Sequence, residues 1–263
     1  MLWAGGSYAD SFRLVTYNIL SDEYLWDGIY DYVSDDVLSW ENRRGKIIER
    51  IKELNPDVLC LQELNTASFE CFKEALKAYE GSYAKKASSS DDGVGTFCKK
   101  YIFKETCHNV VFCDGTSNCG RLATQPALFT TLLFKDGKSI LVVNTKIRWS
   151  KEIKPGNSAS NHVQFILKSI SKTGTVVVGD FNMKPDHPLM MDFYSAGLQD
   201  GFSHKNTYSC YANKEFQRID YILSTRDLKS IPFESPFLIT AQPIPNENEP
   251  SDHLPVGSLI VYE

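Results

Sequence analysis

The sequence lacks several features that mark specialised classes of protein. No apolar run reaches the roughly 18 residues of a transmembrane helix, and no basic start precedes an apolar stretch with a small-residue cleavage site. The seven cysteines are an odd number without a Cys-x-x-Cys pair, which argues against a zinc site and a complete disulfide framework. We therefore expect a soluble protein with reduced thiols in the cytoplasm, with the nucleus as the alternative.

Charge of one sign is also scarce. The chain has 28 Lys and Arg against 33 Asp and Glu, a net charge of −5. A polyanionic substrate would therefore need a local basic patch or bound cations. The 263 residues are 42% hydrophobic and 12% aromatic, which is enough for the core of one large α/β domain. We expect a weakly structured segment at 1–10, a single domain over 11–263 and, by default, a monomer.

Short apolar strands alternate with amphipathic helices along the chain. Apolar residues at helical spacing predict helices within 47–54, 69–79 and 163–170. Apolar runs predict strands at 14–18, 58–61, 93–98, 110–113, 127–134, 139–144, 176–178, 218–223 and 256–262. The polar stretches 85–92 and 243–250 are expected to be surface loops.

The most informative run is the one that ends in Asp180 and Asn182. Three valines and a glycine precede Asp180, which is typical of a strand buried on both faces. Residues two apart on an extended chain point the same way, so the carboxylate and the amide would emerge together. Such a pair can hold a water or a phosphate oxygen, although an Asx turn at the strand end explains the short run equally well.

Other strands also end in polar residues. Asn18, Glu63 and Asn144 each follow an apolar run, Asp220 lies inside the strand at 218–223, and Asp252 comes just before the last strand. An unpaired carboxylate near a core costs several kcal/mol, so these acids imply a shared metal or a hydrogen-bond network. Their oxygen-rich chemistry suits Mg²⁺, with Mn²⁺ as the alternative.

Six short motifs occur in a fixed order between residues 16 and 253. They are Thr16-Tyr17-Asn18, Leu61-Gln62-Glu63, Val143-Asn144-Thr145, Gly179-Asp180-Phe181-Asn182, Ile219-Asp220-Tyr221 and Ser251-Asp252-His253. This ordered set resembles the endonuclease/exonuclease/phosphatase superfamily. The resemblance implies an α/β fold of the deoxyribonuclease type: a four-layer α/β/β/α sandwich of two mixed sheets, with the active site at one edge.

The resemblance also implies a role for each acid. Glu63 would be the principal metal ligand, assisted by Asn18 and Asp252. Asp180 would orient or deprotonate the attacking water. A metal ion lowers the pKa of a bound water and neutralises phosphate oxygens, which agrees with this division.

The remaining motif residues would hold the phosphate. The resemblance implies that Asn182 and Asn144 contact non-bridging oxygens, and that His253, kept protonated by Asp220, stabilises growing negative charge. The structural alternatives are a turn or helix cap for Ser-Asp-His and an ion pair between Asp220 and Arg218. Gln62 alternates with Glu63 and is expected to support the fold.

Lys146 departs from the family pattern. The deoxyribonuclease and deadenylase branches usually have a histidine after the Asn-Thr pair, whereas this chain has Lys146. A lysine supplies positive charge but cannot relay a proton between two ring nitrogens. Reduced or redirected activity is the expected consequence, and a solvated lysine is the structural alternative.

Three further segments resemble the deadenylase and nocturnin group: 40–44, 92–97 and the region from Trp149 to the third helix. Arg44 is a candidate phosphate contact, with the protein surface as the alternative for it and for Arg43. Lys151 replaces a proline that often follows the tryptophan. Glu215 stands where an aromatic is expected, so Phe216 is the candidate base-stacking residue; stacking contributes roughly 1–3 kcal/mol per base.

Basic residues follow the strand that ends at Asn144, namely Lys146, Arg148, Lys151 and Lys154. They could form a track for a nucleic-acid backbone, and a solvated loop is an equal alternative.

The favoured hypothesis is a magnesium-dependent phosphodiesterase that removes nucleotides from the 3′ end of single-stranded RNA or poly(A), as a deadenylase does. The alternatives are a phosphatase or phosphodiesterase for a small phosphate ester (nucleotide, inositol phosphate or lipid head group) and an abasic-site DNA endonuclease. A third hypothesis, a binding protein on a retired nuclease scaffold, rests only on Lys146, and the complete acidic set argues against it.

Overall fold

The computed structural model describes residues 11–86, 91–112, 125–150, 156–202, 208–212, 214–232 and 242–263. The expectations for the segment 1–10, for Cys113 and Cys119, and for Lys151 and Lys154 lie outside these residues. The five described cysteines are free thiols, as the sequence predicts.

Two six-stranded mixed sheets form the centre of the molecule. The first runs in the order β13 (Leu228–Pro232), β14 (Val256–Tyr262), β1 (Ser11–Asn18), β2 (Val58–Leu64), β4 (Gly93–Lys99) and β3 (Tyr79–Lys85). The second runs β5 (Glu105–Phe112), β6 (Pro126–Leu133), β7 (Ser139–Lys146), β8 (Thr175–Asp180), β12 (Asp220–Ser224) and β9 (Gln199–Asp200). The pairs β1–β2 and β7–β8 are parallel, and the other neighbours are antiparallel.

Helices lie outside the sheets. They are α1 (Asp35–Leu38), α2 (Trp40–Leu54), α3 (Thr66–Ala75), α4 (Ser158–Ser169) and α5 (Pro188–Ser195), with a 3-10 turn, η1, at Asp22–Tyr24. α2 ends where Asn55 adopts a left-handed conformation ahead of Pro56. α3 begins with a reciprocal cap between Asn65 and Ser68. Among the described residues no helix is long and apolar enough to cross a membrane.

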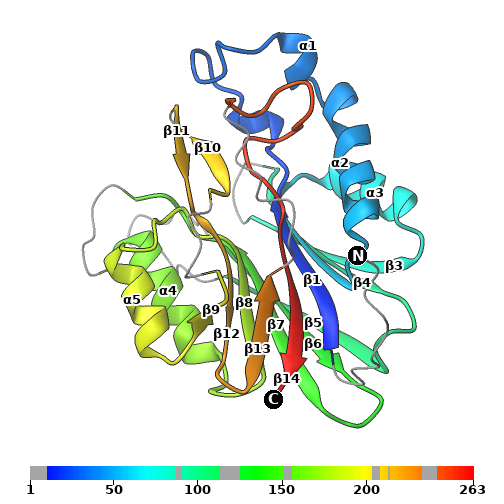
Figure 1. Ribbon diagram of the computed structural model, residues 1–263, viewed down its shortest axis with the longest axis vertical. Coiled ribbons are helices and arrows are strands. Elements are labelled where there is room, and N and C mark those ends of the chain that lie inside the picture. The colour runs from blue at the N-terminus through cyan, green and yellow to red at the C-terminus, as the bar shows by residue number, and fades with distance from the viewer. Residues whose placement is uncertain are drawn as a thin grey trace.

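Three apolar layers hold these elements together. Inward-facing residues of both sheets, such as Leu14, Val142 and Val178, form the central core. The outer face of the first sheet packs against α2 and α3, and that of the second against α4 and α5. Figure 1 shows the two helix pairs on opposite sides of the sheets. The predicted four-layer α/β/β/α sandwich is thus confirmed.

The hydrophobic pattern misplaces several boundaries, such as the start of β5 at Glu105 and of β12 at Asp220, and most clearly the end of α3. Tyr79 has helical spacing from Phe72 but begins β3, because α3 ends at Ala75 and Leu76 closes its last turn. Tyr79 still packs against the same cluster as Phe72, which explains why the apolar pattern continues across the break. The short strands β9, β10 (Cys210–Ala212), β11 (Glu215–Gln217) and β13 also have no clear signal in the sequence.

Candidate active site

The candidate site lies between the two sheets, at the end where β1, β7 and β8 finish. Val178 of β8 is buried in the central core, and Asp180, two residues on, faces the same way at the end of the strand. The register places Lys146 of β7 and Asp220 of β12 on either side of Asp180. Asn18 ends β1 in the opposite sheet. Polar inner positions at neighbouring strand ends therefore converge, as the sequence predicts.

Glu63 reaches this site through a bulge in β2. Strict alternation would place it on the outer face beside Leu59 and Leu61, beneath the helices. The register of β2 shifts between Gln62 and Leu64, and Glu63 has a φ of +61°. Leu64 therefore takes the apolar position in the outer layer, and the carboxylate of Glu63 turns toward the end of the sheets. A left-handed non-glycine residue costs of the order of 1–3 kcal/mol, a strain typical of functional positions.

The amide of Asn18 joins the acids of the two sheets. Its Nδ2 donates to Glu63 Oε1 at 2.7 Å and to Asp180 Oδ2 at 3.0 Å, while its Oδ1 accepts from the Leu20 amide at 3.0 Å. The backbone N–H of Ser21 donates to the other oxygen of Glu63 at 2.7 Å. Asn18 thus fixes the orientation of both carboxylates, and its oxygen is already engaged.

Asp180 has the environment of a general base. Oδ1 accepts from the Asn182 amide N–H at 2.9 Å, and Oδ2 accepts from the Asn182 side chain at 3.2 Å. Burial, reinforced by the neighbouring acids Asp220 and Glu63, raises the pKa of Asp180 to about 7 against the opposing charge of His253. A carboxylate with this pKa accepts a proton readily near neutral pH.

Gly179 is required by the approach of β7. A Cβ on Gly179 would lie 1.8 Å from the carbonyl oxygen of Thr145, and its φ is +137°. Only glycine satisfies both conditions, so the residue before Asp180 fixes how closely β8 approaches its neighbour.

Asp220 and His253 form a buried acid–imidazole pair. His253 Nδ1 lies 2.8 Å from Asp220 Oδ2, which also accepts from the Ser209 hydroxyl at 2.7 Å. Burial lowers the pKa of His253, but the charges of Asp220 and Asp252 outweigh it and raise the value to about 10. The imidazolium form is therefore favoured at neutral pH. Arg218 contacts Asp200 instead, so the alternative pairing with Asp220 is wrong.

Asp252 lies beside this pair. Tyr30 donates its hydroxyl to Asp252 Oδ2 at 2.8 Å. Burial raises the pKa of Asp252, and the charge of Glu63 acts in the same direction against that of His253. Asp252 Oδ1 is buried and accepts no hydrogen bond within the described part of the chain. An unsatisfied buried carboxylate oxygen is costly, which is consistent with a cation site.

Lys146 enters the site as an ion-pair partner. Its Nζ lies 2.7 Å from Glu63 Oε1 and 4.0 Å from the centre of the Tyr24 ring. Burial lowers the pKa of Lys146, but the charge of Glu63 more than compensates and the net change is upward. Burial likewise raises the pKa of Glu63, and Lys146 and Asn18 bring it below its ordinary value. The alternative of a solvated lysine is thereby excluded.

Asn144 lies deeper than expected. Its Nδ2 donates to the carbonyl of Gly95 at 2.9 Å, its Oδ1 accepts from Gln62 Nε2 at 2.8 Å, and the side chain is fully buried. These bonds link the two sheets behind the site, so Asn144 does not face a substrate phosphate here, and we exclude it from the proposed site. Gln62, which also donates to Thr16, has the supporting position predicted for it.

The remaining candidates lie outside this network. Trp149 is 60% exposed beyond the end of β7, and Arg44 is exposed on α2. Phe216 lies on the β10–β11 hairpin, 4.8 Å from the ring centre of Tyr211, and Figure 1 shows this hairpin at the same end of the molecule as α1. Arg43 is buried and binds backbone carbonyls, including that of Ile19 at 2.8 Å, so it is structural.

The sequence pattern did not identify several residues that complete the site. Ser209, Tyr30 and Tyr24 come from irregular segments or short elements, and none belongs to the six motifs. Hydroxyl groups are common throughout the chain, so only their contacts with Asp220, Asp252 and Lys146 distinguish these three residues.

The carboxylates of the site fit a divalent metal whose remaining ligands are supplied by water or substrate. The oxygen donors of Glu63 and Asp252 suit Mg²⁺ or Mn²⁺. Within the described ranges no group of three or more His, Cys, Asp or Glu side chains is placed to hold an ion by itself, so water or substrate would have to complete the coordination. The contact from Lys146 to Glu63 is the one feature that opposes a metal there.

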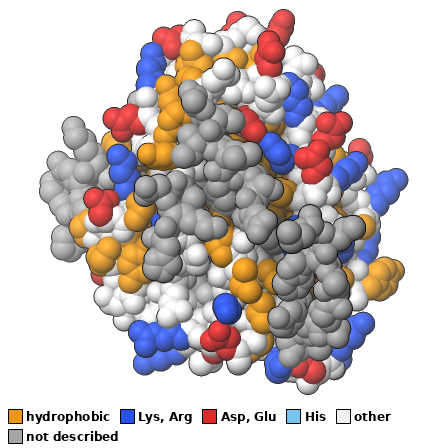
Figure 2. All heavy atoms as spheres, in the orientation of Figure 1, with side chains coloured by type: hydrophobic (Ala, Val, Ile, Leu, Met, Phe, Trp, Pro, Cys, Tyr) orange, Lys and Arg blue, Asp and Glu red, His pale blue; other side chains and the backbone are white. Residues whose placement is uncertain are grey.

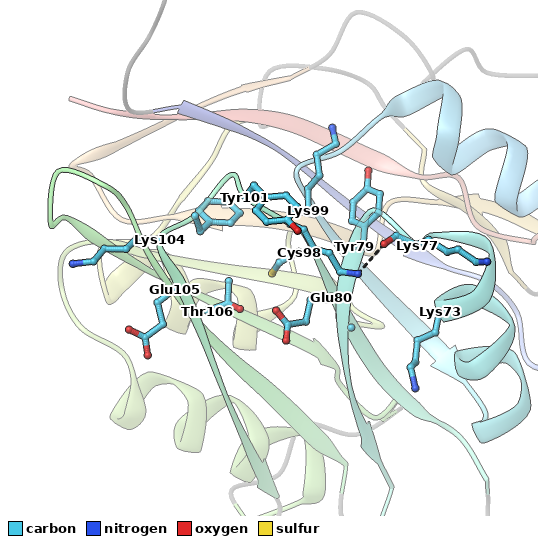
Figure 3. Close-up of a pocket in the computed structure, with 13 residues that line it drawn as sticks. Lys73, Lys77, Tyr79, Glu80, Cys98, Lys99, Tyr101, Lys104, Glu105 and Thr106 are labelled. Atoms are coloured by element: carbon cyan, nitrogen blue, oxygen red, sulfur yellow. Dashed lines mark hydrogen bonds between the residues drawn. The ribbon is translucent and has the colours of Figure 1, made fainter.

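A cavity of about 810 Å³ lies away from these residues. Figure 3 shows Lys73, Lys77, Lys99 and Lys104 around it, with Glu80 and Glu105 from β3 and β5. Its Cys98 pairs with Val58 at the start of β2, whereas Glu63 lies near the end of that strand. Five residues of strand separate the two positions, roughly 17 Å, so this cavity is not part of the candidate site.

Comparisons with known proteins agree with this geometry. A family model described as the Endonuclease/Exonuclease/phosphatase family matches residues 15–253. Protein angel of Drosophila melanogaster is 25% identical over 95% of this chain and 80% of its own length. RNA exonuclease NGL1 of Saccharomyces cerevisiae is 24% identical over 93% of this chain and 91% of its own length. The chain matches only 36% of the CCR4-Not complex 3′-5′-exoribonuclease subunit Ccr4 of Candida glabrata, at 25% identity over 94% of this chain.

Solved structures share the fold. ANGEL2, described as a 2′,3′-cyclic phosphatase, superposes with a TM-score of 0.84 at 21% identity, covering 95% of each chain. The human Nocturnin catalytic domain gives 0.75 at 22% identity, covering 98% of this chain and 95% of its own. The chain therefore belongs to the endonuclease/exonuclease/phosphatase family of phosphoric ester hydrolases.

Proposed function

We propose that this chain is a divalent-metal-dependent phosphodiesterase that removes nucleotides from the 3′ end of single-stranded RNA, poly(A) included. The observation that carries the proposal is the convergence of Glu63, Asp180 and the Asp220–His253 pair at one end of the sheets. A base, an imidazolium and a carboxylate suited to a cation are the groups that phosphate ester hydrolysis requires.

Each group has a defined task in this proposal. Asp180 accepts the proton of the attacking water, and its pKa of about 7 suits that role. His253, held by Asp220, places positive charge beside the phosphate as negative charge grows. Glu63 and Asp252 would hold Mg²⁺ or Mn²⁺, which when bound lowers the pKa of a water and neutralises phosphate oxygens. Asn182 orients Asp180 through its backbone N–H and its side-chain amide, which also donates to the Ile147 carbonyl at 2.9 Å. Both hydrogens of that amide are thus engaged, and its contact with the phosphate stays a prediction of the resemblance.

A row of aromatic rings beside the site supports a nucleotide substrate. The ring centres of Tyr30 and Tyr32 lie 6.4 Å apart, and those of Tyr32 and Tyr211 5.6 Å apart. Phe216 continues the row, 4.8 Å from Tyr211 and 5.8 Å from Tyr208. Because Tyr30 bonds to Asp252, the row extends outward from the acidic site. Bases stack on such surfaces with little sequence preference.

Charge is mixed over the visible surface. Figure 2 shows acidic and basic side chains interspersed on that face, in keeping with a net charge of −5. Attraction of a nucleic-acid backbone would then depend on local basic groups. Of the proposed basic track, the structure describes Lys146 and the exposed Arg148.

The relatives suggest a second candidate function. NGL1 is named an RNA exonuclease, whereas ANGEL2 is described as a 2′,3′-cyclic phosphatase. Opening a cyclic phosphate at an RNA 3′ end uses the same water and the same charge stabilisation as exonucleolytic cleavage. We keep this reaction as the second candidate, within the class of phosphatases and phosphodiesterases for small phosphate esters.

The test is a substrate panel with Mg²⁺. It contains 5′-labelled oligoadenylate and mixed-sequence RNA, the same RNA ending in a 2′,3′-cyclic phosphate, abasic duplex DNA and small phosphomonoesters. A ladder of products shortened from the 3′ end is the expected result. Opening of the cyclic phosphate without shortening would favour the second candidate, and release of phosphate from small esters alone would contradict the proposal. Glu63→Gln is the inactive control.

We also propose that the enzyme acts as a monomer in the cytoplasm. Light scattering at increasing protein concentration and microscopy of the tagged full-length protein test these two statements. A mass of twice 29.7 kDa, or signal confined to the nucleus, would contradict them.

A further inference from the structure

Lys146 makes a contact that matters for the proposed metal site. Its ammonium lies 2.7 Å from Glu63 Oε1, with only 13% of the lysine side chain and 7% of the glutamate side chain exposed. The Tyr24 ring covers the ammonium from another side, 4.0 Å away. A charge-assisted hydrogen bond in so buried a place is among the stronger contacts a side chain makes.

The oxygens of Glu63 are shared among three donors. Oε1 accepts from Lys146 and Asn18, and Oε2 accepts from the backbone N–H of Ser21. The Ser21 donor is fixed by the main chain, and Asn18 is tied to both Asp180 and the Leu20 amide. Lys146 is the donor on a long flexible stem, so it is the one that can leave.

A divalent ion and the Lys146 ammonium cannot share this oxygen. Mg²⁺ binds carboxylate oxygen at about 2.0–2.1 Å and carries two positive charges, which would repel an ammonium in the same position. A bound ion must therefore displace Lys146 from Glu63.

The surroundings offer the displaced ammonium a second position. The Tyr24 hydroxyl donates to Asp92 at 2.5 Å, so an aromatic face and a carboxylate lie beside Lys146. Asp180 is its register neighbour on β8. Asp92 is already paired with Lys86 at 3.3 Å, so the Tyr24 ring and Asp180 are the groups toward which the displaced ammonium can move.

We propose that Lys146 is a built-in cation that competes with the divalent metal for Glu63 and thereby weakens metal binding at this site. The inference rests on the proposed metal-dependent function and assigns a regulator of that site. It explains how a lysine can occupy this place while the acidic set remains complete: the protein stabilises Glu63 without a metal and admits the metal only at a higher concentration.

The test measures metal binding directly, without turnover. Free Mn²⁺ is followed by electron paramagnetic resonance during titration of the wild-type protein, Lys146→Met and Lys146→Arg. Lys146→Met should bind Mn²⁺ at least tenfold more tightly, because the competing charge is gone. Lys146→Arg keeps the charge and should stay within about threefold of the wild type. Should Lys146→Met fail to fold, Lys146→Gln removes the charge while keeping a donor to Glu63.

Lys86→Met is the matched control. Lys86 lies 3.3 Å from Asp92 and 3.2 Å from the Tyr24 hydroxyl. The substitution Lys86→Met therefore removes one positive charge from the same region and leaves the contacts of Glu63 unchanged. Its Mn²⁺ affinity should change less than threefold. Equal tightening by Lys86→Met and Lys146→Met, or no tightening by Lys146→Met, would overturn the inference.

The two proposals fail in different ways. Wild-type protein that binds Mn²⁺ and hydrolyses RNA, with no gain in Mn²⁺ affinity for Lys146→Met, overturns the competition alone. Absence of Mn²⁺ binding in every variant overturns both the competition and the metal-dependent function. Mn²⁺ binding that tightens as expected without any hydrolysis supports the competition and refutes the proposed reaction.

Discussion

Replacing Arg43 with methionine should lower the stability of the fold, although Arg43 is not one of the candidate active-site residues. The side chain is 1% exposed. Its guanidinium donates to the carbonyls of Leu38 at 2.7 Å, Ile19 at 2.8 Å and Pro250 at 3.3 Å, and pairs with Asp22 at 2.6 Å. Arg43 thus holds together the segment after β1, the start of α2 and the approach to the last motif.

The magnitude follows from the groups left unpaired. Methionine has a similar length but no donor, so buried carbonyl oxygens lose their partner at about 1–3 kcal/mol each. Asp22 is 52% exposed, so its lost ion pair adds at most about 1 kcal/mol, and the carbonyls bring the total cost to about 3–5 kcal/mol. For a domain of this size each kcal/mol lowers Tm by about 2–4 °C, so we expect a fall in Tm of about 10 °C.

Arg44→Met is the control for this prediction. Arg44 is the next residue on α2 and is exposed, so its loss should change stability by less than about 0.5 kcal/mol. Calorimetry and urea unfolding of both variants give the comparison. Equal Tm values for Arg43→Met and Arg44→Met would refute the structural role of Arg43.

Three further predictions concern the site and its support. Glu63→Gln should lower kcat/KM at least about 100-fold, since outer partners of metal sites already cost 10–100-fold; near-wild-type turnover with an unchanged circular dichroism spectrum would contradict the ligand assignment. The imidazolium of His253 is lost as pH rises through its pKa of about 10. Asp220→Asn removes a charge that raises this pKa, so the alkaline limb of kcat/KM should move about 1–3 pH units lower; an unmoved limb would contradict the pairing. Burial lowers the pKa of His162 to about 3, so the unfolded chain binds its proton more tightly and stability should fall by about 2 kcal/mol between pH 7.5 and pH 5. His162→Gln should remove that part of the acid sensitivity in urea titrations at the two pH values, and an unchanged difference would refute it.

The sequence predicts the layers of this protein because the spacing of apolar residues in each helix or strand shows whether one face or both faces of that element are buried. The valines before Asp180 indicate a strand covered on both sides, and they lie in the central and outer cores. Isoleucines such as Ile47 and Ile51 at helical spacing place α2 against the first sheet. Long, strongly patterned segments are therefore assigned correctly, and only their ends move.

The position of Glu63 could not be predicted in the same way. Alternation along β2 places its side chain beneath the helices, and only a left-handed residue within a bulge turns it into the site. Nothing in the residue types around it requires a bulge, because Leu64 would suit either face. The motif resemblance identified Glu63 by its order in the chain, and the backbone distortion supplies the physical reason.

Asn144 and Lys146 illustrate the opposite limit. Both face the inner layer of β7, two residues apart, so periodicity treats them alike. Their positions relative to the opposite sheet separate them. Asn144 bonds to Gly95 between the two sheets, whereas Lys146, at the end of β7, contacts Glu63. Depth along a strand depends on the pairing of other strands, which a local pattern does not contain.

The bridge made by Asn18 links groups from different sheets, Glu63 on one side and Asp180 on the other. The spacing of those two carboxylates is therefore a property of sheet alignment and not of any single strand. Apolar side chains in the middle of the sandwich therefore set this spacing, and a change in their volume would change the distance between the proposed base and the proposed cation site. Substitutions in the apolar core could therefore change activity during evolution while every residue that contacts the substrate stays the same.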